Sequence, residues 1–291
     1  MADRSRGECG EGGSGIGSFL RSLLSGIPWS ERAEVEETLT LERPDCGGIK
    51  IDNANGRTRV VGEERDDIEV HLFKIARAES EEQARGLVQG IGLLSREEGD
   101  HLVIEFDVPR SWNRRGRVDV ELRVPRDLRV SVLAANGRIC LNGLRAAVRA
   151  RSSNGAVRVE NVTGDVDIAT SNAKVSSLCT CGRMVARSSN GKIEVEDHRG
   201  SVDAHTSNGT IHCALQELGK EGIVLATSNG RIVLDLPDPV DGDVDIRVDN
   251  GVIRTGRDFD GSQRSGRLKG TLGRGGVPIK LRASNGTISL R

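Results

Sequence analysis

The strongest constraint in this sequence is an asparagine that recurs every 18 residues through the middle of the chain. Asn136, Asn154, Asn172, Asn190 and Asn208 form this series, and a glycine follows each of them except Asn172, which precedes Ala173. Further copies begin after longer gaps, at Asn229, Asn250 and Asn285. Equal spacing over successive copies is the signature of a repeat architecture.

The residues between the asparagines alternate as strands do. Apolar residues stand three positions after the asparagine, at Ile139, Val157, Val175, Ile193 and Ile211. A second apolar row stands twelve positions after it, at Val148, Val166, Met184 and Val202. Alternation of apolar and polar residues predicts two short strands in each unit. We expect Asn-Gly to form one turn, because both residues tolerate positive φ, and Gly164, Gly182 and Gly200 to form the other.

Two topologies fit this pattern. In a β-solenoid each unit is one coil and equivalent residues stack about 4.8 Å apart, whereas in a meander the units are antiparallel hairpins. The equal register and the repeated Ser-Asn corners favour the solenoid. The predicted fold class is therefore all-β, a β-solenoid or β-helix-like stack of two-strand rungs. A structural turn ladder would follow the corners at Asn136, Asn154, Asn172, Asn190, Asn208, Asn229, Asn250 and Asn285.

The shortage of aromatic residues agrees with a thin core. Aromatics make up 2% of the chain, and none stands between Asn136 and Asn250. Stacked ladders of Val, Ile, Leu and Ala leave little room for a ring. They also lack the platforms on which sugars or bases usually stack.

The chain divides into three predicted segments. Residues 1–35 are expected to be flexible, with a short amphipathic helix, and residues 36–135 to form a β-rich cap over the open end of the repeat. A capping box, Ser80-Glu81-Glu82-Gln83, predicts one helix in the cap over about residues 80–91. Residues 136–291 form the 18-residue-repeat solenoid, with an irregular C-terminal closure.

Several stretches resemble a known bacterial family. VDVELRVPRDLRVSVLAANGRICLNGL, SSNGAVRVENVTGDVDI and LKGTLGRGGVPIKLRASNGTISLR look like the toast-rack putative-adhesin family. The likeness runs from about Glu36 to Arg291. It implies a β-solenoid-like domain of unknown function and supplies no catalytic residues.

The N-terminal segment carries one apolar helical face. It consists of Phe19, Leu20, Leu23, Leu24 and Ile27, and residues 16–29 could contact a membrane surface or a partner. We find no signal peptide and no apolar run long enough to cross a bilayer. These features predict a cytoplasmic protein, with peripheral membrane association as an open alternative.

No group of residues carries a catalytic, metal or cofactor motif. His198, His205 and His212 are seven residues apart, but they stand at different positions of the repeat, so we interpret them as separate surface histidines. Asp165, Asp167 and Asp203 stand on outward rows and could bind a cation or act on a glycan, or they form ladder pairs with arginines. We therefore predict no enzyme activity, no cofactor and no small-molecule substrate.

Charge divides the two ends of the chain. Residues 31–100 hold 18 acidic and 10 basic residues, whereas residues 251–291 hold two aspartates and nine Lys/Arg. The family resemblance implies a non-enzymatic adhesin-like or scaffold module. The opposite charges predict that this module associates with a protein partner or with itself through its ends. The alternative is a glycan-binding or glycan-cleaving solenoid that uses the aspartates. Nucleic acid is disfavoured, because no aromatics accompany the basic tail.

Overall fold

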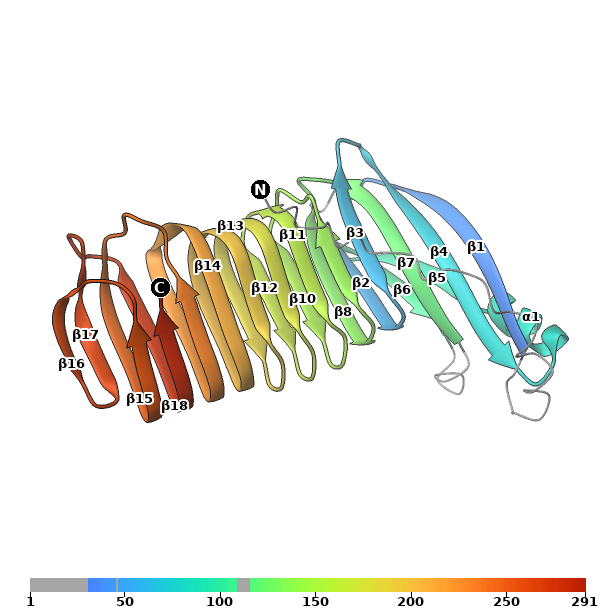
Figure 1. Cartoon of the computed structure of the whole chain (residues 1–291). Helices are drawn as coiled ribbons and strands as arrows, with labels where there is room; N and C mark the ends of the chain where they lie inside the picture. The colour runs from blue at the N-terminus through green and yellow to red at the C-terminus, as the bar shows by residue number, and fades with distance from the viewer. Residues whose placement is uncertain (1–30, 46, 109–115) are drawn as a thin grey trace, which may run out of the picture.

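A computed structural model describes residues 31–45, 47–108 and 116–291. The described chain forms a long rod of stacked coils with a broader sheet at its N-terminal end (Figure 1). Within these residues there are eighteen strands and one short helix. The expected all-β, solenoid-like fold is confirmed.

The N-terminal part of the described chain contains nine strands, and a single helix lies between the fourth and the fifth. Their bounds are β1 (Glu31–Glu42), β2 (Gly48–Asn55), β3 (Thr58–Glu63), β4 (Asp67–Ala78), α1 (Glu81–Gln89), β5 (Gly92–Glu98), β6 (His101–Asp107), β7 (Gly116–Pro125), β8 (Arg129–Asn136) and β9 (Ile139–Asn142). The rest of the rod comprises β10 (Val148–Ser152), β11 (Val157–Thr163), β12 (Val166–Thr170), β13 (Val175–Ser188), β14 (Ile193–Asp235), β15 (Gly242–Thr255), β16 (Asp260–Arg264), β17 (Arg267–Leu272) and β18 (Pro278–Leu290).

Successive units pair in parallel and in register. Val148 of β10 lies beside Val166 of β12, which lies beside Met184 of β13. On the opposite face of the rod, Val157 of β11 lies beside Val175 of β13. Because a meander would pair its units antiparallel, this register identifies the solenoid. Each coil therefore contributes one strand to each of two facing sheets.

The core between the two sheets is thin and aliphatic. Inward rows such as Val157, Val175 and Ile193 are fully buried, and they face a row of small residues that includes Ala150 and Ala186. Side chains of this size fill the space between sheets without aromatic rings. Burying one large aliphatic side chain stabilises the fold by about 1.5–3 kcal/mol, so these rows are the main source of stability.

The corner that carries Asn-Gly is stacked too closely for most side chains. A Cβ on Gly155 would lie 1.6 Å from the carbonyl oxygen of Gly137, and a Cβ on Gly209 would lie 2.1 Å from that of Gly191. The expected positive φ was wrong for Gly137, Gly155, Gly191 and Gly209, the glycines that follow asparagines of the 18-residue series. None of the asparagines of that series has a positive φ either. The stacking distance, rather than the turn conformation, selects glycine here.

At the second turn, positive φ is confirmed. Gly164, Gly182 and Gly200 have φ values of 139°, 130° and 140°. This is a region of backbone conformation that side chains disfavour.

Beside the glycines, asparagine side chains form a continuous chain of hydrogen bonds. Asn154 Nδ2 donates to Asn136 Oδ1 at 2.8 Å, and Asn172 Nδ2 donates to Asn154 Oδ1 at 3.0 Å. The same contact repeats along the rod and joins, in spatial order, Asn55, Asn136, Asn154, Asn172, Asn190, Asn208, Asn229, Asn285 and Asn250. Buried hydroxyls add a parallel ladder, in which Thr206 Oγ1 donates to the carbonyl of Gly191 at 3.2 Å.

The order of coils in space differs from their order in sequence at both ends. The first coil, β2–β3, lies between the coil of β6 and β7 and the coil of β8 and β9. The last segment, β18, lies between β14 and β15. The irregular C-terminal stretch between Asn250 and Asn285 includes the hairpin β16–β17, which pairs with β15. The first coil and the last coil in sequence are thus each paired with a neighbouring coil on both sides.

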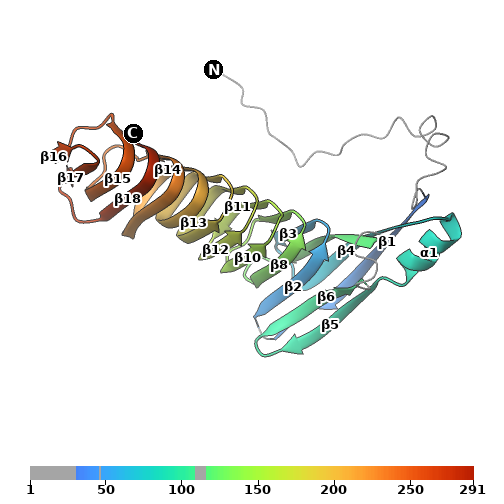
Figure 2. The ribbon, with the colours of Figure 1, turned by 90° about the horizontal axis from the view of Figure 1, so that it is seen from below.

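The N-terminal end of the rod is widened by strands that leave the coil pattern. β4 pairs with β7 and β1 pairs with β4, while β5 pairs with β6 (Figure 2). Helix α1 packs against β1 and β4 through Ala84 and Val88, and Ser80 Oγ accepts a hydrogen bond from Gln83 N at its start. The expected division at residue 136 falls at the last residue of β8, within one coil.

One histidine belongs to the interior. His198 is 1% exposed, and its Nδ1 lies 2.8 Å from Thr180 Oγ1, which lies 3.0 Å from Ser177 Oγ. Burial lowers the pKa of His198. The interpretation of three surface histidines was therefore wrong for His198, because its position in the corner points the ring into the coil.

The corner stacking makes a direct prediction for stability. We expect Gly155→Ala to lower the free energy of unfolding by about 1–3 kcal/mol, because the new methyl group must displace the adjacent coil. Chemical denaturation measures the change. The matched control is Gly256→Ala, where no atom lies within 4 Å of the new Cβ; equal stability of the two variants would contradict the stacking argument.

The buried histidine makes the stability depend on pH. Since the pKa of His198 is lower in the folded chain than in the unfolded chain, the unfolded chain takes up the proton first as the pH falls. Stability should therefore decrease as the pH falls below about 6.5, by at most about 1.4 kcal/mol per pH unit from this group. Unfolding of wild type and His198→Gln at pH 7 and pH 5 tests this, and an identical pH slope in the two proteins would argue against it.

Candidate functional site

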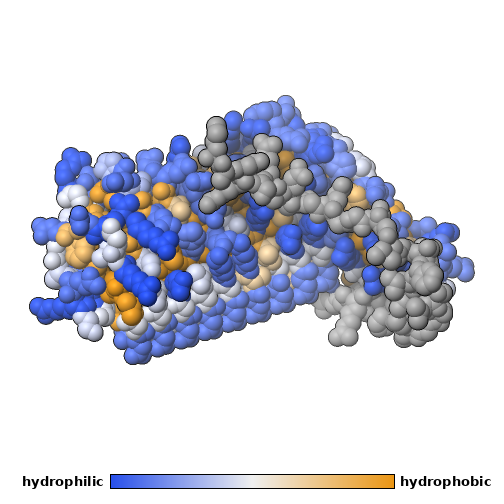
Figure 3. All heavy atoms as spheres, in the orientation of Figure 1, coloured by the Kyte–Doolittle hydropathy of each residue, from blue (hydrophilic) through white to orange (hydrophobic). Residues whose placement is uncertain are grey.

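A groove follows the Asn-Gly corner along one flank of the rod. It encloses about 920 Å³ and crosses coils from β8 to β15. One wall is a row of exposed serines that precede the ladder asparagines: Ser153, Ser171, Ser189, Ser207, Ser228 and Ser284. The other wall carries basic side chains at Arg151, Arg187, His205, Arg282 and Arg247. Figure 3 shows regular hydrophilic rows along the lower rim of the rod.

The basic wall of this corner groove is partly neutralised by neighbouring aspartates. Arg151 donates two hydrogen bonds to Asp167, at 2.8 and 2.6 Å. His205 Nε2 lies 2.6 Å from Asp203 Oδ1. Arg187 has no carboxylate within 4 Å among the described residues. The groove therefore presents hydroxyls and a few basic side chains, together with the carboxylate of Asp249.

The candidate aspartates lie in the adjacent outward row. Asp167 is shared by Arg151 and Arg149, the latter at 3.4 Å. Later in the rod, hydrogen bonds from Arg247 lower the pKa of Asp245. Of the three interpretations that we considered for these carboxylates, a cation site, glycan chemistry and ladder pairs, the geometry favours ladder pairs.

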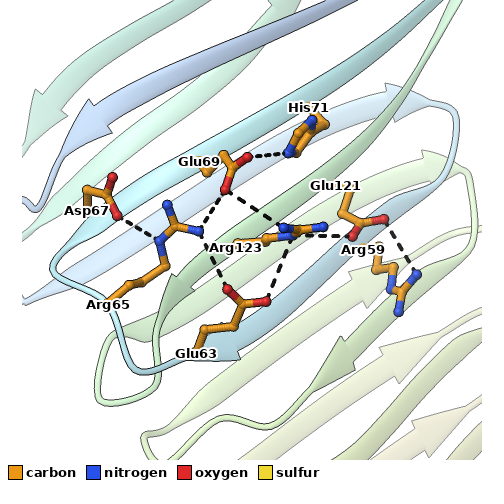
Figure 4. Close-up of polar contacts among 8 residues, drawn as sticks. All are labelled: Arg59, Glu63, Arg65, Asp67, Glu69, His71, Glu121 and Arg123. Carbon is orange, nitrogen blue, oxygen red and sulfur yellow. Dashed lines mark hydrogen bonds and ion pairs between the residues drawn. The ribbon is translucent and has the colours of Figure 1, made fainter.

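The largest group of ionisable side chains lies on the outer face of β3, β4 and β7 (Figure 4). Arg65 lies 2.7 Å from Asp67 and 2.8 Å from Glu69, and Glu69 lies 2.6 Å from His71. Arg123 and Arg59 continue the network through Glu63 and Glu121. Hydrogen bonds from Arg65 lower the pKa of both Asp67 and Glu69. The network joins three strands and leaves no arginine without an acidic neighbour.

Thiols and metal ligands add no reactive centre within the described part of the chain. Cys213 is buried, and burial raises the pKa of its thiol to about 12. Burial also raises the pKa of Cys179, although that residue is exposed. Among the described residues, no three His, Cys, Asp or Glu side chains form a group that could hold a metal ion.

The two ends of the rod present unpaired strand edges. At the N-terminal end, β1 pairs only with β4 and β5 only with β6 within the described residues. At the C-terminal end, β16 pairs only with β17. Glu97 and Glu98 lie on β5, whereas Arg264 lies on β16 and Lys269 on β17, and all four are exposed. The ends thus differ in sign, as the sequence composition predicts.

The apolar face proposed for membrane or partner contact lies outside the described residues. It comprises Phe19, Leu20, Leu23, Leu24 and Ile27. The cytoplasmic location with peripheral membrane contact remains a prediction from that segment. The described part of the chain contains no helix that is long and apolar enough to cross a membrane.

Solved structures of similar shape come from three bacteria. A putative adhesin from Bacteroides fragilis is 12% identical, with 89% of this chain and 97% of that chain covered and a TM-score of 0.47. A putative adhesin from Parabacteroides merdae is also 12% identical, with coverages of 90% and 97% and a TM-score of 0.40. A putative cell adhesion protein from Clostridium sporogenes is 10% identical, with coverages of 89% and 99% and a TM-score of 0.31.

Family membership rests on the sequence itself. Among curated proteins, none matches this chain. Residues 46–291 match the family described as Toastrack DUF4097, which covers all of the coils and most of the N-terminal sheet. The resemblance drawn from the repeat units is therefore confirmed. The chain belongs to the Toastrack family.

Proposed function

We propose that this protein is a non-enzymatic, adhesin-like interaction module that associates end to end with further copies of itself. The observation that carries the proposal is the presence of free strand edges of opposite charge at the two ends of one rigid stack. Each copy would add its coils to those of the next, so that the sheets continue from copy to copy. The function of such an assembly is to present the flank of the rod repeatedly along a fibre.

The strand edges supply the first part of the argument. β5 and β16 are the outermost strands of the same sheet, at opposite ends of the rod (Figure 2). A free edge leaves backbone donors and acceptors available to a strand of another chain. Leu94 on β5 is 53% exposed, and all five residues of β16 are exposed. A head-to-tail contact would bury these residues.

Charge supplies the second part of the argument. The contact would place Glu97 and Glu98 of one copy near Arg264 and Lys269 of the next. Arg264, Lys269 and Glu97 have no ion pair within 4 Å in the described chain, so each is available to a partner. Opposite charges at two heterologous surfaces favour this orientation, and a contact that does not close into a ring produces a linear chain of copies.

The flank of the rod supports binding rather than catalysis. Its carboxylates at Asp167 and Asp245 are each paired with an arginine, and Asp203 lies beside His205. The alternative of a glycan-cleaving solenoid needs one carboxyl group that stays protonated, and no feature of this row provides it. The serines and threonines of the corner groove instead offer an ordered surface for a ligand.

End-to-end association predicts complementary behaviour of charge-reversal variants. We expect wild type to form larger species as its concentration rises at low salt, and Glu97→Lys/Glu98→Lys or Arg264→Glu/Lys269→Glu to remain monomeric. An equimolar mixture of the two variants should associate again, because each end then meets an opposite charge. Sedimentation velocity at low and high salt measures all four samples.

The control reverses two charges on the flank. Glu217→Lys/Lys220→Glu changes exposed residues away from both ends and should sediment like wild type. A wild-type protein that is monomeric at every concentration at low salt would refute the proposal. So would a mixture of the two end variants that remains monomeric while each is folded.

A further inference from the structure

Five arginines converge on a pocket at the N-terminal end of the rod. Arg32 of β1, Arg77 of β4, Arg117 of β7, Arg57 after β2 and Arg138 before β9 line a space of about 540 Å³. Asp119 is the single carboxylate among the residues that line it. We call this set of five the arginine pocket. It is an excess of positive charge within a region whose overall composition is acidic.

The pairing of the strands places these arginines directly beside one another. Arg32 and Arg77 are partners in the antiparallel register of β1 and β4. Arg57 and Arg138 immediately precede Thr58 and Ile139, which are partners in the parallel register of β3 and β9. Like charges at opposed positions of a sheet destabilise it. Packing of the fold does not require arginine at these exposed positions.

Few of these charges are neutralised within the protein. Arg117 Nη2 lies 2.9 Å from Asp119 Oδ2, and Arg32 contacts Glu34. Asp119 Oδ1 accepts a hydrogen bond from the backbone N–H of Arg57 at 2.7 Å. The guanidinium groups of Arg57, Arg77 and Arg138 have no carboxylate within 4 Å in the described chain.

Other arginines on and beside the same strands have acidic neighbours. Arg59, Arg65 and Arg123 on and beside β3 and β7 face Glu63, Asp67, Glu69 and Glu121 in the balanced network of Figure 4. In the arginine pocket, by contrast, the guanidinium groups of Arg57, Arg77 and Arg138 lack such a counter-charge within the described chain.

The side-chain amide of Asn55 adds a hydrogen-bond donor of another kind to the same pocket. Each asparagine of the corner ladder donates its Nδ2 to the preceding asparagine, except Asn55, which begins the ladder and only accepts. Asn55 also lines the arginine pocket. The pocket thus combines guanidinium groups with an amide donor, and these are the groups that bind oxyanions.

We propose that the arginine pocket binds a ligand that carries at least two phosphoryl groups. A guanidinium group matches phosphate oxygens in a bidentate way, and several of them around one concave space suit a compact, multiply charged anion. The volume lies in the range of small-ligand sites. No aromatic residue lines the pocket, so it lacks the aromatic platforms on which nucleic-acid bases usually stack.

Calorimetry with inorganic pyrophosphate at constant ionic strength tests the site. We expect binding by wild type and about tenfold weaker binding for each of Arg77→Gln and Arg138→Gln, since each loses one charge-assisted contact. Without ligand, both variants should melt at or above the wild-type temperature in low salt, because a repulsive contact is removed. A purely structural role for the arginines predicts lower melting temperatures instead.

The control is Arg65→Gln, which lies on the same face but has acidic partners. It should melt at a lower temperature and bind pyrophosphate as wild type does. The proposal is overturned if wild type does not bind pyrophosphate, or if Arg77→Gln and Arg138→Gln each bind it as tightly as wild type does. Binding of single-stranded DNA without any binding of pyrophosphate would also overturn it.

A second arm of the experiment identifies the source of the phosphoryl groups. Vesicles of phosphatidylcholine with and without a phosphoinositide bisphosphate are sedimented with the protein. Retention by the phosphoinositide vesicles that pyrophosphate displaces identifies a lipid headgroup. Binding of pyrophosphate with no retention identifies a soluble ligand. Both results support the site.

Discussion

The close approach of successive coils at the Asn-Gly corner is the constraint on which the rest of this structure depends. The corner glycines stack so tightly that an added Cβ on Gly155 or Gly286 would lie 1.6 or 1.7 Å from a carbonyl oxygen of the preceding coil. This approach brings the asparagine amides into hydrogen-bonding distance of one another and the hydroxyls of the neighbouring row within reach of the glycine carbonyls. The side-chain amides, the hydroxyls and the backbone all repeat once per coil. If one coil is displaced relative to its neighbours, several ladders of hydrogen bonds therefore break together.

The ends of the rod follow from the same requirement. A stack of coils has an exposed layer at each end, and the terminal layer of a repeat protein is the first to open. Here the terminal coils in sequence are not terminal in space: β2–β3 lies inside β6–β7, and β18 lies inside β15. Arg291 N donates to Leu234 O and its carbonyl accepts from Leu236 N, so even the last residue is paired. Opening of the C-terminal strand therefore requires separation from two neighbours, while the remaining edges stay free for other contacts.

The sequence predicts the repeating part of this architecture well and the exceptions poorly. The 18-residue spacing and the alternation around Val157 or Ile193 report ladder stacking and burial, which repeat in every coil. The placement of β18 depends on an interaction between distant segments, which the 35-residue gap before Asn285 marks without explaining. The interior position of His198 follows from the hydrogen bond with Thr180, one coil away, and is invisible in the local pattern. The arginine pocket was missed for a similar reason, since its members come from five separate segments. The available signals were the two arginines at Arg57 and Arg59, separated by one residue, and Arg117 directly after Gly116.

Charge along the rod follows two rules that have different physical causes. Where rows of the repeat carry charges, in-register stacking can place an arginine next to an aspartate, as in Arg149 with Asp167. Where strands leave the repeat, no ladder enforces this balance, and the sign of the charge can accumulate. The acidic edge at β5 and the basic hairpin β16–β17 lie in such regions. The arginine pocket combines arginines of strands outside the coils with Arg57 and Arg138 at two corners of the coils. The repeat thus provides a regular, rigid spacer, and the charges that can recognise another molecule accumulate at its two ends.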